Sequence, residues 1–158
     1  MLTIKESYHK LLKSKEFKHE KFLCSALLIS DINNIEKSLW QIDFYNEDSD
    51  TVNTYTIGDD IEVNKESKIF KDGKTKIEKL DLDEVKTDFS EIYQHALDIL
   101  KKHRENAVKV VIILQKQKQT LWNILFITRG FNILNIKIDA EDGKVIEEKI
   151  TSFVKFEK

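Results

Sequence analysis

The sequence has no proline, four glycines and a single cysteine among its 158 residues. Without a stretch rich in proline or glycine there is no flexible linker, so we expect continuous ordered structure. One cysteine excludes an intramolecular disulfide, a paired-thiol redox motif and a zinc ribbon. Cys24 lies in the apolar run FLCSALLIS (22–30), which places it in the expected core.

Long apolar runs are also missing. The longest, such as Phe22–Ile29 and Val110–Leu114, are far shorter than the roughly 20 residues of a membrane-spanning helix. The N-terminal segment carries Lys5, Glu6 and Lys10, where a signal peptide needs an apolar centre. The sequence therefore predicts no membrane span and a cytoplasmic localisation.

Arginine is scarce, because Arg104 and Arg129 are the only two among 26 basic residues. The 28 acidic residues bring the net charge to −2. A nearly neutral chain with few bidentate donors is a poor match for phosphates and bases, so we expect no nucleic-acid partner. The 41% of hydrophobic residues is enough for a real core, and the length suits one domain or two very small ones.

Periodicity and turn signals predict two helices and a series of strands. Thr3 and Glu6 form a capping box for a helix that ends near Lys15, and Asp88 caps a second helix over 89–103. The Asp72-Gly73 pair indicates a polar hairpin within 61–82. The expected strands cover residues 21–30, 39–45, 51–57, 107–116, 120–128, 131–140 and a last segment to about 154.

Two of these strands are apolar on both faces. Val110 and Ile112 alternate with Val111 and Ile113, and 120–128 shows the same pattern. A strand of this kind has to bury both faces, so we expect a covering layer on each side of the sheet.

An internal similarity connects the two halves of the chain. SLWQIDF (38–44) and TLWNILF (120–126) share Leu, Trp, Ile and Phe at an offset of 82 residues. Weaker matches of helix and strand residues lie on both sides, so the order helix, strand, strand, strand occurs twice. Repeated supersecondary units indicate an internal duplication.

Residues 88–146 resemble a PepSY domain. The resemblance rests on an amphipathic helix, the strands VKVVIIL and TLWNILF, and an ending that reads Ile136, Ile138, Asp139, Ala140, Gly143 and Val145. It implies a cystatin-like arrangement in two copies, a divergent one in 1–82 and a second in 83–158, joined in one compact body. The expected fold class is therefore α+β, with two repeats of a helix packed on a curled antiparallel sheet.

The family resemblance also implies a function, because PepSY modules are non-catalytic and are associated with the regulation of peptidases. They are usually extracytoplasmic, and the cytoplasmic localisation expected for this chain departs from that habit. From the residues alone, Asp139 and Gly143 need no ligand, since Asp binds backbone amides and Gly adopts left-handed turns.

Trp40 and Trp122 hold matching places in the two halves and are the candidate binding residues. Large aromatic residues usually anchor a core, and on a concave sheet they would instead line a groove for a peptide or a lipid.

The remaining polar patterns give no catalytic or metal site. Asn46, Asp48 and Asp50 have the first three spacings of a calcium loop, but Thr51 and Ile57 stand where Gly and Glu are needed. The four histidines form no ligand pattern, and no serine lies in a nucleophile elbow. We therefore predict no metal, no cofactor and no enzymatic activity.

Charge is unevenly distributed along the chain. Residues 41–62 carry seven acidic side chains and no basic one, whereas 101–118 carry six basic side chains and one acidic. Solvated surface explains both regions. Each could also dock a partner of opposite charge, and the basic region of one copy could dock on the acidic region of another. The sequence thus favours a module that binds a protein or peptide, with a homodimeric scaffold or chaperone-like protein as the alternative.

Overall fold

The computed structural model describes residues 1–68 and 76–152, except for the side chains of 65–68. Helices α1 (Ile4–Leu12) and α2 (Phe89–Lys102) begin at the predicted caps. The Thr3 hydroxyl accepts from the Glu6 amide at 3.1 Å, and the Glu6 carboxylate accepts from the Thr3 amide at 2.8 Å. Helix α1 ends before the predicted Lys15, because the Ser14 amide and hydroxyl both donate to the Leu11 carbonyl.

The strands follow the predicted segments closely. Two short 3₁₀ turns, Ile35–Lys37 and Leu82–Glu84, precede β2 and α2 respectively. The strands are β1 (Leu23–Asp31), β2 (Gln41–Asn46), β3 (Thr51–Ile57), β4 (Ile61–Lys68), β5 (Ala107–Gln117), β6 (Gln119–Thr128), β7 (Asn132–Asp139) and β8 (Val145–Ser152).

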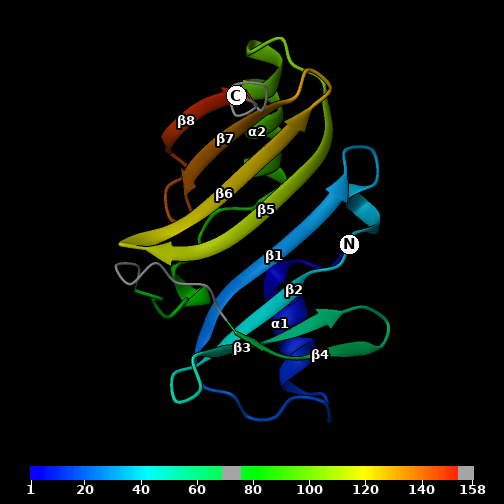
Figure 1. Cartoon of the computed structure of the whole chain (residues 1–158), viewed down its shortest axis with the longest axis vertical. Helices are drawn as coiled ribbons and strands as arrows, with labels where there is room; N and C mark the ends of the chain where they lie inside the picture. The colour runs from blue at the N-terminus through cyan, green and yellow to red at the C-terminus, as the bar shows by residue number, and fades with distance from the viewer. Residues whose placement is uncertain (69–75, 153–158) are drawn as a thin grey trace.

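These strands form one antiparallel sheet in the order β4-β3-β2-β1-β5-β6-β7-β8 (Figure 1). The prediction of two repeats, each with a helix on its own curled sheet, is therefore wrong. The reason is the pairing of β1 with β5, which runs from Ser25 opposite Gln115 to Asp31 opposite Lys109. Each strand satisfies the backbone groups of the other, so two separate sheet edges are replaced by one continuous ladder.

Both helices lie on the same side of the sheet, behind it in Figure 1. The face toward them carries the core, including Leu28, Ile112 and Ile124, which have no exposed surface. The expectation of a covering layer on each face is wrong for the described residues, because no second layer of helices or strands lies on the other face.

The segment 61–82 also differs from its prediction. Residues 61–68 form β4 and pair with β3, where Ile57 lies opposite Ile61 and Tyr55 lies opposite Val63. The expected turn at Asp72-Gly73 falls outside the described residues. Neither of the described helices is long and apolar enough to cross a membrane.

Candidate functional site

The two predicted binding residues lie together in the core. The ring centroids of Trp40 and Trp122 are 6.2 Å apart, and Phe89 of α2 lies 5.6 Å from each. Trp40 is 1% exposed and Trp122 is fully buried. The structure thus favours core packing over an open aromatic groove.

The two indoles differ in their hydrogen bonding. The indole N–H of Trp122 donates to the Thr87 hydroxyl at 2.9 Å, and that hydroxyl donates in turn to the Ala140 carbonyl at 2.9 Å. The indole N–H of Trp40 finds no acceptor among the described residues. A cavity of about 380 Å³ lies beside Trp40, between the start of α1 and the β3–β4 turn.

The feature that stands out is the face of the sheet that the helices leave uncovered, called here the open face. Its centre is apolar across four neighbouring strands. Register pairs join Leu27 to Ile113, Ile29 to Val111, Val111 to Leu125, and Ile127 to Ile133. We call this set the apolar patch: Leu27, Ile29, Val111, Ile113, Leu125, Ile127 and Ile133. Its members are partly exposed, and Ile29 is 50% exposed.

Two asparagines interrupt the apolar patch. Asn123 lies between Ile113 and Lys137 in register, and Asn135 lies next to Leu125. The side-chain amide oxygen of each is buried and accepts no hydrogen bond from the described residues. These two amides are polar groups inside an otherwise apolar surface. A partner that covers this surface has to donate hydrogen bonds to them or leave them unsatisfied.

A partly buried polar cluster lies beside the apolar patch, on β1, β2 and β3. The Asp43 carboxylate accepts from the Ser25 hydroxyl at 2.9 Å and from the Thr54 hydroxyl at 2.5 Å. Burial raises the pKa of this carboxyl above its usual range, although the two hydroxyl donors oppose the shift. Burial and the nearby Asp43 charge raise the pKa of the Cys24 thiol to about 12. A thiol that stays protonated at neutral pH is a poor nucleophile.

Charged side chains surround the apolar patch in an uneven way. In the half formed by β1–β4, the described charged residues of the open face are Asp31, Asp43 and Glu62. In the half formed by β5–β8 they are Lys109, Lys137, Lys149, Asp139 and Glu147. These assignments follow from the strand register. The first half is therefore net negative and the second net positive.

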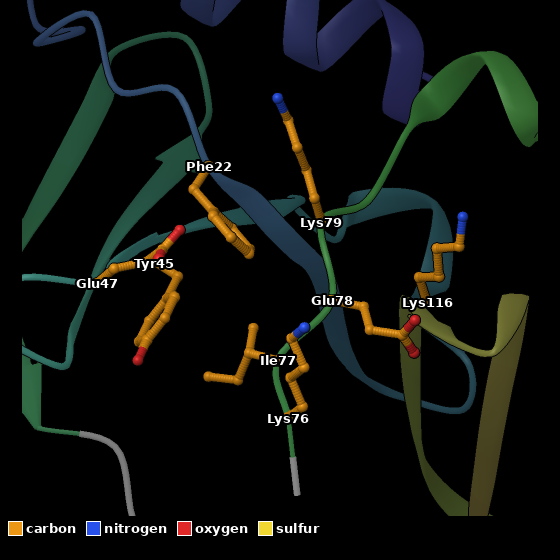
Figure 2. Close-up of a pocket in the computed structure, with 8 residues that line it drawn as sticks. All are labelled: Phe22, Tyr45, Glu47, Lys76, Ile77, Glu78, Lys79 and Lys116. Atoms are coloured by element: carbon orange, nitrogen blue, oxygen red, sulfur yellow. The ribbon is translucent and has the colours of Figure 1, made fainter.

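A shallow cavity of about 640 Å³ extends the open face where residues 76–79 run past β1. In Figure 2, Ile77 points toward the side of Phe22 and Tyr45, whereas Lys79 points away from them. Phe22 and Tyr45 make an edge contact with ring centroids 5.4 Å apart. The floor is apolar and the rim carries mixed charge, which suits contact with another polypeptide better than recognition of one charged group.

The other sequence patterns resolve into ordinary structure. The side chain of Asn46 accepts from the Asp48 amide at 3.1 Å, as in a simple turn. No three His, Cys, Asp or Glu side chains of the described residues come together as a metal site. Gly143 has a φ of +76°, and Asp139 accepts from the Glu141 amide at 2.7 Å, so both serve the turn as expected.

No family model matches this chain, and neither does any curated protein. Among solved structures, the chain is similar to a protein from Clostridium difficile 630 that is described as a putative lipoprotein. The TM-score is 0.55 at 18% sequence identity, and the alignment covers 82% of each chain. Such low identity shows a shared fold and nothing further. The PepSY resemblance and the cytoplasmic localisation stay predictions.

Sequence reasoning found the members of the apolar patch on β5 and β6, but neither those on β1 and β7 nor the exposure of the patch. The alternation in β5 and β6 shows that Val111, Ile113 and Leu125 are apolar on the second face. Periodicity does not tell how many layers a fold builds, so burial of that face was the natural expectation. Two such strands in a sequence that predicts two helices are the signal that one face of the sheet stays open.

Proposed function

We propose that this chain is a non-enzymatic module that binds a protein or peptide partner through the open face of its sheet. The observation that supports it is the apolar patch. Its seven side chains lie on four strands about 4.8 Å apart, at a spacing of about 7 Å along each strand, which corresponds to an area of about 240 Å². Apolar side chains that lie next to one another on the surface mark an interaction site more often than apolar residues that are exposed singly.

The surroundings of the patch also support binding. An apolar centre with a polar, charged rim is the usual composition of a protein interface. Here the centre is Val111 and its neighbours, and the rim includes Asp31 and Lys109, whose charged groups lie 3.7 Å apart. The PepSY resemblance adds a peptidase, or a peptide that a peptidase acts on, as the class of partner to test first.

The test compares two lysine substitutions of similar chemistry on opposite sides of the sheet. Ile29→Lys places a charge in the apolar patch, and Leu12→Lys places one on the solvent side of α1, where Leu12 is 41% exposed. Each tagged variant and the wild type are incubated with lysate of the source cells, and bound proteins are quantified by mass spectrometry. Circular dichroism confirms that the variants are folded.

We expect a stoichiometric companion to be recovered with the wild type and with Leu12→Lys, and lost with Ile29→Lys. A charge in the centre of an interface is poorly solvated once the partner covers it, so binding weakens strongly. Recovery of the same companion with Ile29→Lys would show that the open face is not the binding surface. A second patch variant, Leu125→Lys on β6, has to give the same result.

A further inference from the structure

We propose that the partner on the open face is a second copy of this chain, with the two sheets packed face to face around a two-fold axis parallel to the strands. The inference rests on the proposed function and names its partner. Two sheets packed in this way form a sandwich about 10 Å thick, in which the apolar side chains of both inner faces interdigitate.

The size of the open face matches what such a dimer needs. Eight strands about 4.8 Å apart, each about 23 Å long, present about 800 Å² on one side of the sheet. A standard stable interface buries about 800 Å² on each partner. A two-fold interface uses the same surface on both copies, so one exposed patch supplies both sides of the apolar centre.

The charges of the open face decide the direction of the axis. An axis parallel to the strands places the β1–β4 half of one copy over the β5–β8 half of the other. Asp31, Asp43 and Glu62 then face the half that holds Lys109, Lys137 and Lys149 together with Asp139 and Glu147, which is net positive by one charge. An axis perpendicular to the strands would instead place each half over itself. Like charges would then face each other, which opposes association.

Lys149 is the residue best suited to test the direction of the two-fold axis. It lies on β8 opposite Asn135 and is exposed, and no ion pair joins it to a described residue. Lys102 offers a matched control, because it is exposed at the end of α2 on the other side of the sheet. Lys149→Glu and Lys102→Glu change the net charge by the same amount, so any difference between them reports the location of the charge.

The experiment measures the dimer dissociation constant of the full chain by sedimentation equilibrium, over about 1 to 500 µM protein. We expect the wild type to dimerise and Ile29→Lys to raise the dissociation constant at least about tenfold. Leu12→Lys leaves it unchanged. Lys149→Glu raises it and Lys102→Glu does not, and added salt weakens the wild-type dimer because it screens the facing charges.

Several results would overturn the inference. A strict monomer over the whole concentration range excludes the dimer, and a dimer that tolerates both Ile29→Lys and Leu125→Lys uses another surface. A dimer strengthened by Lys149→Glu has the perpendicular axis. If the chain is monomeric and yet loses a foreign companion on Ile29→Lys, the partner is not a second copy, while the proposed binding function stands. If the patch variants change neither measurement, both proposals fail.

Discussion

The two tryptophans of the core show how one side chain depends on a partner far away in the sequence. Trp40 and Trp122 follow the same local pattern, and both are buried as that pattern predicts. Their environments differ because Thr87 lies beside only one of them, 35 residues before Trp122. A tertiary hydrogen bond of this kind has no local signal, so sequence reasoning found the rings and missed the acceptor.

We expect Thr87→Val to lower the free energy of unfolding by about 1–3 kcal/mol, because it leaves the buried indole N–H of Trp122 without an acceptor. Urea denaturation measures the change. A double-mutant cycle with Trp122→Phe separates this bond from the rest of the loss. Strictly additive costs in the cycle would show that the bond contributes nothing. Trp40→Phe is the control, since its N–H has no acceptor among the described residues.

At the scale of elements, alternation and caps located most strands and both helices, because these signals depend on neighbouring residues. Trp122, Ile124 and Phe126 face the core in the predicted phase. The sequence did not reveal which strand pairs with which across the two halves. Ser25 meets Gln115 across 90 residues of chain, and only the geometry of the whole sheet selects that partner.

The turn between β7 and β8 depends on one glycine. Gly143 has a φ of +76°, and a Cβ atom there would lie an ordinary 3.6 Å from the Thr87 side chain. Backbone strain is therefore the dominant cost of a substitution. We expect Gly143→Val to lower the free energy of unfolding by about 1–2 kcal/mol. Gly143→Asn is the matched control and should cost much less, since Asn tolerates this conformation. Equal losses in thermal melts would contradict the strain argument.

For the whole molecule, the main consequence of the β1–β5 pairing is that both halves of the chain share one core. Leu28 of β1 and Ile112 of β5 lie opposite each other and are fully buried. The contact between Trp40 and Trp122 crosses the same boundary on the helix side. If one half unfolded by itself, a long strand edge and an apolar surface of the other half would be exposed to water.

The chain should therefore unfold as one cooperative unit, and a substitution at the β1–β5 junction should destabilise both halves together. We expect Leu28→Ala to cost about 2–5 kcal/mol through lost burial and the cavity it leaves. Tryptophan fluorescence and far-UV circular dichroism should still report a single coincident transition. Leu12→Ala, at a 41% exposed position, should change stability by no more than about 0.5 kcal/mol. Two separate transitions in Leu28→Ala would mean that each half holds its own core and that the β1–β5 ladder only connects them.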